Sequence, residues 1–321
     1  MLALLFPGQG SQEVGMGRDV AEASPDARAA FEAADAALGF PLSRLCFEGP
    51  EEELRRTEMQ QPAILATSIA LLRALEAETR LAPAWVAGHT LGEYSALVAA
   101  GSLGFEDAVR LVHARGRYMQ EAVPEGKGAM AAVLGAAPEA VERACAQARE
   151  ATGRVVSPAN YNSPQQTVIA GDAVAVEWAC TRLREAGARR TVPLPVSAPF
   201  HCALMAHAAE KLAPELGSVS FADPHPPVVT NVEARPNERG DRVAELLRTQ
   251  ITAPVRFTAM IDTLVSLGVT HVLEVGPGRV LCGLVARITP RLERASLGGL
   301  ADLPTAREFV ARGAAQGALG G

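Results

Sequence analysis

The sequence predicts an α/β fold, with a central and mainly parallel sheet and a small inserted domain. Short apolar runs at 2–6 and 272–275 are typical of strands that are covered on both faces. Long helical patterns lie between such runs, as in a doubly wound sheet. Residues 125–196 have a different order of elements, β-α-β-β-α-β, which predicts a ferredoxin-like unit.

The elements of the large domain follow from their apolar spacing and their end signals. Helix 61–79 has apolar side chains at helical intervals, among them Ile64, Leu71 and Leu75. Further helices are expected at 21–39, 93–100, 106–123, 202–216, 243–251 and 257–267, and strands at 2–6, 84–87, 228–232 and 272–275.

The domain boundaries follow from these changes of pattern. We expect a discontinuous large domain formed by 1–124 and 197–305, and a small domain formed by 125–196. The glycine- and alanine-rich segment 306–321 has little to bury and is predicted to be a mobile tail.

Composition excludes several classes of protein. The 321 residues are 48% hydrophobic and carry 30 basic and 36 acidic side chains, so no excess of positive charge favours nucleic acid. The five cysteines form no C-x-x-C pair, which argues against a zinc site or a disulfide framework and favours a reducing cytoplasmic setting. No apolar run is long enough to cross a membrane, and the first run is too short for a signal peptide.

The segment Gly88-His89-Thr90-Leu91-Gly92 has the layout of a nucleophile elbow, G-x-S-x-G, between an apolar strand and a helix. The two glycines allow a sharp turn, and the central hydroxyl then points out at the N-terminus of the helix. That central residue is Thr90, although β-branched side chains tolerate such strained backbone poorly.

Several separated segments resemble malonyl-CoA:acyl carrier protein transacylases, which are relatives of the acyltransferase domains of fatty-acid and polyketide synthases. Those segments are the elbow itself, 5–12 (LFPGQGSQ), 115–120 (RGRYMQ), 128–133 (GAMAAV), 160–164 (NYNSP), 199–201 (PFH) and 274–278 (EVGPG). The resemblance implies a hydrolase-like large domain and an acyl-enzyme on the elbow hydroxyl.

The resemblance also implies the catalytic roles. Thr90 would attack the malonyl thioester, and His201 would accept its proton, although a lone histidine is more often part of a core. The backbone N–H groups of Gln9 and Leu91 would form the oxyanion hole. The resemblance places the carbonyl that orients the histidine at Gln250 and gives no base role to His89.

The predicted substrate-binding residues are Arg115, Gln250, Phe200, Asn160 and Asn162. A guanidinium at 115 can hold the free malonyl carboxylate through two hydrogen bonds, whereas an ordinary helix arginine faces solvent. A ring at 200 would leave less room for methylmalonyl. The two asparagines would border the channel for CoA or pantetheine, unless they only form turns.

The implied partners are malonyl-CoA, which is a substrate and not a cofactor, and holo-acyl carrier protein. No cofactor or metal is implied, and we expect a cytoplasmic monomer that binds neither nucleic acid nor membrane. Exposed arginines such as Arg287 and Arg291 are candidates for contact with an acidic carrier, although basic runs usually face solvent alone.

Thr90 leaves three interpretations open: an engineered Ser→Thr substitution, a natural threonine enzyme, or a homologue that only binds carrier protein. A thioesterase with the same elbow is a further alternative, because it would pass malonyl to water. Arg115 and the inserted domain favour transfer to a thiol. A covalent malonyl adduct on Thr90 would distinguish an enzyme from a docking module.

Overall fold

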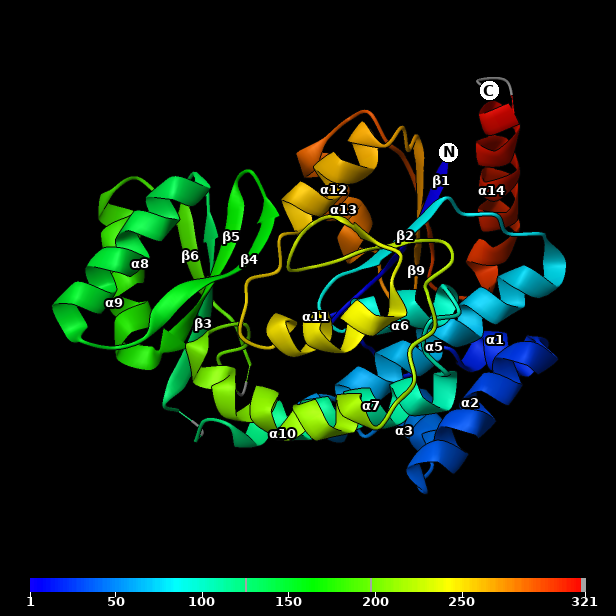
Figure 1. The fold of residues 1–321 in the computed structure, drawn as a ribbon, viewed down its shortest axis with the longest axis horizontal. Coiled ribbons are helices and arrows are strands. Elements are labelled where there is room, and N and C mark those ends of the chain that lie inside the picture. Colours follow the sequence, from blue (N-terminus) through cyan, green and yellow to red (C-terminus); the bar gives the residue numbers. More distant parts are fainter. Residues whose placement is uncertain (125, 197, 319–321) are drawn as a thin grey trace.

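The computed structural model describes residues 1–124, 126–196 and 198–318 and contains two sheets (Figure 1). The larger sheet has the strand order β10-β9-β1-β2-β7-β8. Its strands are β1 (Leu2–Phe6), β2 (Trp85–Gly88), β7 (Val228–Val229), β8 (Pro236–Asn237), β9 (His271–Val275) and β10 (Glu293–Leu297). All neighbours pair in parallel except β7 and β8, so the sheet is mainly parallel, as predicted.

The strand β1 lies in the middle of this sheet and pairs with β2 on one side and with β9 on the other. Every residue of β1 and β9 is buried, because helices cover both faces of the sheet. Parallel strands end at one edge, and their carboxyl ends bring Phe6, Gly88 and Val275 to that edge. Binding sites of α/β sheets form there.

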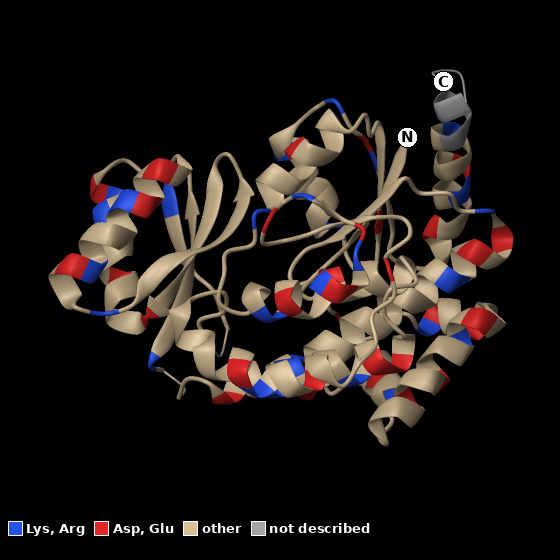
Figure 2. Ribbon diagram, in the orientation of Figure 1, with Lys and Arg blue, Asp and Glu red and all other residues tan. Residues whose placement is uncertain are grey.

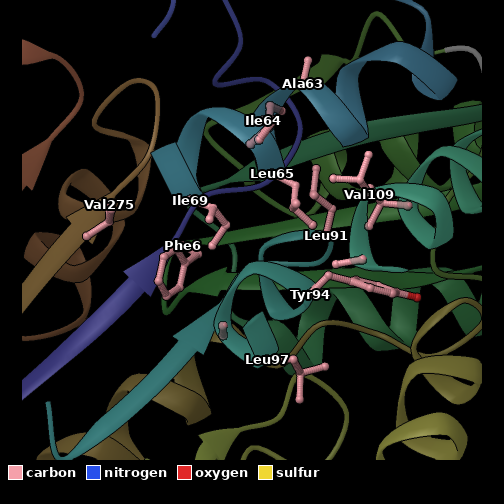
Figure 3. Packing of buried hydrophobic residues seen from close by; sticks show 14 of the residues in the cluster. Phe6, Ala63, Ile64, Leu65, Ile69, Leu91, Tyr94, Leu97, Val109 and Val275 are labelled. Carbon is pink, nitrogen blue, oxygen red and sulfur yellow. The ribbon is translucent and has the colours of Figure 1, made fainter. Parts of the chain in front are cut away.

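Helices surround the larger sheet. They are α1 (Arg18–Ala23), α2 (Pro25–Leu38), α3 (Leu42–Glu48), α4 (Glu51–Leu54), α5 (Thr57–Glu78), α6 (Gly92–Ala99), α7 (Phe105–Glu121), α10 (Ala206–Gly217), α11 (Val243–Gln250), α12 (Phe257–Ser266), α13 (Val280–Ile288) and α14 (Leu303–Ala318). The helix α5 is buried along most of its length, and Figure 3 shows its Ile69 beside Phe6 of β1 and its Leu65 close to Leu91. The elbow therefore lies next to a well-packed hydrophobic core.

The smaller sheet is antiparallel and has the order β4-β5-β3-β6. Its elements are β3 (Gly128–Leu134), α8 (Pro138–Thr152), β4 (Val156–Ser163), β5 (Gln166–Asp172), α9 (Ala173–Glu185) and β6 (Arg190–Pro193). Figure 1 shows α8 and α9 together on the outer face of this sheet, away from the larger sheet. The order and pairing are those of a ferredoxin-like unit, which confirms the predicted class, while the exact domain boundaries remain a prediction.

Several sequence-based expectations need correction. Residues 306–313 belong to the helix α14, in which Ala306, Phe309 and Val310 are buried, so this part of the segment is not the mobile tail that we predicted; residues 319–321 lie outside the described residues. The predicted helix 21–39 is two helices, because Ser24 leaves helical geometry and caps α2. The strand predicted at 228–232 stops at Val229. The elements α3, α13 and β10 were not predicted.

Charged side chains lie mainly on the outer helices, where the two signs alternate (Figure 2). Several ion pairs of the described residues join side chains three or four positions apart, such as Arg44 with Glu48 and Arg182 with Glu185. Among the described residues, no helix combines the length and the apolar character that crossing a membrane requires.

Candidate active site

The turn between β2 and α6 is the elbow that the sequence predicts. A Cβ on Gly88 would lie 1.9 Å from the carbonyl carbon of Gly92, and a Cβ on Gly92 would lie 2.1 Å from the carbonyl oxygen of Phe6. Only glycine fits at these two positions, because α6 starts directly against the ends of β1 and β2. The residue between them is held out at the carboxyl edge of the sheet.

Thr90 occupies the tip of the elbow with a φ of 51°, in the left-handed region that β-branched residues rarely adopt. Its γ-methyl group lies over Gly8 of the first glycine loop, since a Cβ on Gly8 would come within 2.7 Å of Thr90 Cγ2. With the methyl group placed there, the hydroxyl stays free to face the opposite side. The missing side chain at Gly8 is what makes room for a threonine at this elbow.

His201 faces that hydroxyl, with its Nε2 2.9 Å from Thr90 Oγ1. Its Nδ1 lies 2.8 Å from the backbone oxygen of Gln250. A carbonyl oxygen can only accept, so Nδ1 carries the proton and Nε2 is left to accept the proton of the hydroxyl. The backbone of His201 also adopts the left-handed conformation, with a φ of 59°.

Burial, together with the nearby positive charge of Arg115, lowers the pKa of His201 to about 3. The imidazole is therefore neutral at physiological pH, which is the state that a general base requires. The carbonyl of Gln250 fixes the orientation of the ring without adding a negative charge.

Arg115 of α7 is fully buried. Its Nη1 donates to Gln61 Oε1 at 2.6 Å, and its Nη2 donates to Gln250 Oε1 at 2.9 Å and to Thr90 Oγ1 at 3.1 Å. These acceptors are all neutral, and Arg115 makes no ion pair within the part of the chain that the structure describes. A buried guanidinium beside a hydroxyl, without a resident anion, is suited to bind a carboxylate from a substrate.

The predicted oxyanion-hole residues lie on the two segments that meet here. Leu91 follows Thr90 directly, and the loop of Gln9 passes against the elbow, since a Cβ on Gly8 would lie 2.5 Å from the backbone oxygen of His89. Among the described residues, no acceptor takes the backbone N–H of Gln9 or of Leu91. The Gln9 side chain is held by Gln60 Oε1 at 2.9 Å.

The remaining predicted residues differ in their relation to the elbow. Asn162 of the small sheet reaches it, because its Oδ1 lies 2.7 Å from His89 Nε2. Asn160 forms a backbone bridge to Val255, and its side chain makes no hydrogen bond within the described residues. Phe200 directly precedes His201 and is buried in the main core.

Sequence reasoning assigned no role to Asn231, Glu93 or Gln61, although all three are buried and bonded to the site residues. A signal existed for Asn231, because it is a polar residue just after β7 and thus at the same edge of the sheet as the elbow. Gln61 lies within α5, where nothing in the local pattern separates it from other helix residues.

Within the described ranges, no group of three or more His, Cys, Asp or Glu side chains could hold a metal ion. The reactive groups that meet at the elbow are the hydroxyl of Thr90, the imidazole of His201 and the guanidinium of Arg115. A hydroxyl on a strand-to-helix elbow, paired with a neutral imidazole, defines the class of enzymes that transfer acyl groups through an ester on the protein.

Comparisons with known proteins agree with that class. A family model described as "Acyl transferase domain" matches residues 3–293. The malonyl CoA-acyl carrier protein transacylase of Escherichia coli K12 is 49% identical over 307 residues, which are 96% of this chain and 99% of that protein. Its counterpart in Bacillus subtilis strain 168 is 48% identical over 292 residues, 91% and 92% of the two chains.

Solved structures agree as well. An acyl carrier protein S-malonyltransferase from Vibrio cholerae superposes with a TM-score of 0.92 at 46% identity and covers 95% of this chain and 99% of that one. A malonyl-transacylase in complex with a type II polyketide synthase acyl-carrier protein gives 0.93 at 47% identity, with coverage of 96% and 99%. The chain belongs to the acyl transferase family, in the group of the malonyl CoA-acyl carrier protein transacylases.

Proposed function

We propose that this protein transfers malonyl from malonyl-CoA to the phosphopantetheine thiol of acyl carrier protein, through an ester on Thr90. The observation that carries the proposal is the position of Thr90 Oγ1, which lies within hydrogen-bond distance of both His201 Nε2 and the unpaired guanidinium of Arg115. One side of the hydroxyl thus has a base, and the other has a site for the distal carboxylate of malonyl.

In the first half-reaction, Thr90 Oγ1 attacks the thioester carbonyl while its proton moves to His201 Nε2. The carbonyl oxygen becomes an oxyanion, and the free backbone N–H groups of Gln9 and Leu91 stabilise it. When the intermediate collapses, the C–S bond breaks and the leaving CoA sulfur takes the proton from His201. Malonyl is then an ester of Thr90.

The second half-reaction reverses these roles. The pantetheine thiol gives its proton to His201 Nε2 and its sulfur attacks the ester carbonyl, which again places negative charge at Gln9 and Leu91. The proton returns to Thr90 Oγ1 as the ester bond breaks. No step requires a metal or a redox cofactor.

Arg115 is proposed to select malonyl over acetyl, because only malonyl has a second carboxylate to bind it. Arg115→Met should lower kcat/KM for malonyl-CoA by at least about a hundredfold, the size of effect that breaking a buried charged pair has. The value for acetyl-CoA should fall far less. Arg117→Met on the same helix is the matched control, because Arg117 is exposed and should leave both values unchanged. Retained malonyl preference in Arg115→Met would reject this role.

The proposal is tested by incubation with malonyl-CoA followed by peptide mass mapping. A malonyl adduct is expected on the peptide that contains Thr90, and it should be lost in Thr90→Ala and on addition of holo-carrier protein. Apo-carrier protein, which lacks the thiol, should leave the adduct in place. An adduct on the nearby Ser95, or no adduct at all, would contradict the mechanism.

The same experiment separates transfer from thioester hydrolysis. A thioesterase would release malonate at the same rate with holo- and apo-carrier protein.

We further propose that Asn162 and Asn160 border the entry for pantetheine, and that Phe200 limits bulkier acyl groups. A reducing cytoplasmic setting and action as a monomer complete the proposal, and the five free cysteines are in keeping with that setting.

A further inference from the structure

The elbow is held by a side chain from another strand end. Asn231 Oδ1 accepts the backbone N–H of Thr90 at 2.7 Å, and Asn231 Nδ2 donates to the backbone oxygen of Gly88 at 2.7 Å. The two bonds fix the peptide groups on either side of His89, directly before Thr90. Such bracing can maintain the left-handed backbone of Thr90, which costs energy in an unsupported loop.

A buried carboxyl group lies behind this bracing and has no place in the proposed acyl transfer. Glu93 is only 2% exposed, and its Oε2 accepts from Gln250 Nε2 at 2.6 Å and from the backbone N–H of Asn231 at 3.3 Å. It lies one turn after Thr90, at the start of α6. It makes no ion pair with any described residue.

The amide of Gln250 connects this carboxyl group to the reacting residues. Its Nε2 donates both to Glu93 and to the backbone oxygen of Thr90, and its Oε1 accepts from Arg115. An ionised carboxylate can only accept, so it forces the NH₂ end of the amide toward itself. The oxygen end is thereby left facing the guanidinium.

We propose that Glu93 is a positioning and selectivity-determining residue: through the amide of Gln250 it holds Arg115 where the guanidinium reaches both the elbow hydroxyl and the malonyl carboxylate. This inference rests on the proposed function. Glu93 itself stays out of contact with substrate, because Gln250 lies between. In its ionised form, Glu93 places a negative charge near Arg115 with Gln250 between them, so the guanidinium keeps no direct anionic partner.

The test is the ratio of kcat/KM for malonyl-CoA to kcat/KM for acetyl-CoA. At about pH 8, where Glu93 is ionised, Glu93→Gln keeps the shape but removes the charge, so the amide of Gln250 is no longer forced into one orientation. The ratio should fall about tenfold or more, which is the usual effect of losing a hydrogen bond to a charged group. The acetyl-CoA value alone should change by less than about threefold. A purely structural role would lower both values together, and that result would overturn the proposal.

A double-mutant cycle tests the route through Gln250. Gln250→Met removes the amide but keeps the backbone oxygen that orients His201, and it should lower the ratio as Glu93→Gln does. The double variant should be no worse than either single one, because both act through the same contact. Additive losses would overturn the proposed route. If Glu93→Gln does not fold, retained discrimination in Gln250→Met overturns the proposal by itself.

Two controls separate this inference from the proposed function. Glu185→Gln removes an exposed acid on α9, far from the site, and should change neither value. The unchanged protein must itself transfer malonyl and prefer it to acetyl. If it does not, the proposed function fails; if it does and Glu93→Gln keeps the ratio, only the role of Glu93 fails.

Discussion

The two residues that react both sit in unfavourable backbone geometry. Thr90 and His201 account for two of the three non-glycine residues with positive φ among those described. Each left-handed residue of this kind costs on the order of 1–3 kcal/mol, which the surrounding contacts must offset. For Thr90 those contacts are the two hydrogen bonds of Asn231.

Thr90→Ser should raise kcat. The γ-methyl group of Thr90 lies between the reacting hydroxyl and the loop of Gly8, where the tetrahedral intermediate must also fit. Removing it relieves crowding and backbone strain of about 1–3 kcal/mol, which corresponds to about five- to 150-fold in rate. Rapid-quench measurement of acylation isolates this step. Equal rates for serine and threonine would mean that the methyl group does not hinder the reaction.

The buried carboxyl of Glu93 predicts a dependence of stability on pH. Burial raises its pKa from 4.5 to about 7, so between these values the folded protein keeps a proton that the unfolded chain releases. The free energy of unfolding contributed by this group therefore falls as pH rises through that window, by on the order of 3 kcal/mol at about 1.4 kcal/mol per pKa unit.

Glu93→Gln removes this contribution. Urea unfolding from pH 4.5 to 8 should show the variant gaining stability relative to the unchanged protein as pH increases. The opposite contribution of His201, whose pKa is lowered, is present in both proteins and cancels in the difference. A difference that stays constant with pH would show that Glu93 is not titrating with a raised pKa.

At the scale of elements, the close approach of α6 to the sheet is what fixes the elbow. Gly92→Ala would place a Cβ 2.1 Å from the backbone oxygen of Phe6, and the helix would have to move. The variant should lose several kcal/mol of stability together with acyl-enzyme formation. Gly283→Ala in α13 is the matched control, because nothing lies within 4 Å of its added Cβ. That control should gain about 0.5–1 kcal/mol in urea unfolding; equal behaviour of the two variants would contradict the packing argument.

The elements that the sequence predicted are those with a strong local pattern. β1 is a continuous apolar run, β9 is apolar except for His271 and Glu274, and both were predicted. β10 has only Leu297 fully buried among its five residues, and its pattern is too weak to mark a strand. α14 was misjudged because its glycines and alanines suggest disorder, whereas Phe309 packs against His271 of β9, a contact that only the tertiary structure provides.

The site was predictable to the extent that its residues lie in recognisable motifs. Thr90, His201 and Arg115 each belong to one of the quoted segments, and the structure brings these three together. Asn231 and Glu93 are joined across 138 positions by contacts through space, and no spacing rule within a segment could relate them. The hydrogen bonds that support the motif residues could therefore be identified only from the three-dimensional structure.

At the scale of the whole molecule, the small sheet is attached directly to the site. Tyr161 donates its backbone N–H to Val255, which in turn donates to Ala159, so a segment of the large domain extends β4. The same segment follows Gln250, whose carbonyl orients His201. The bond between His89 and Asn162 adds a second connection. The small sheet is thus hydrogen-bonded both to the elbow and to the segment that follows Gln250.

We predict that the carrier protein binds at the junction of the two sheets. Arg287 of α13 reaches across to Gln166 of β5, and Arg291 is exposed a turn further on. Carrier proteins are typically acidic, so Arg287→Glu with Arg291→Glu should raise KM for the carrier about tenfold, while KM for malonyl-CoA stays unchanged. Charge reversal at Arg182 and Arg184 on α9 is the control. An unaltered carrier KM would exclude this surface.

The acceptor that orients His201 belongs to the main chain at Gln250. Every amino acid carries the same carbonyl group, so no single codon change can delete this partner, unlike the carboxylate of a Ser-His-Asp triad. Inherited variation at position 250 can alter only the amide that serves Arg115. Substitutions at position 250 can therefore change the acyl-group selectivity over evolutionary time, while the carbonyl that orients the base His201 is retained.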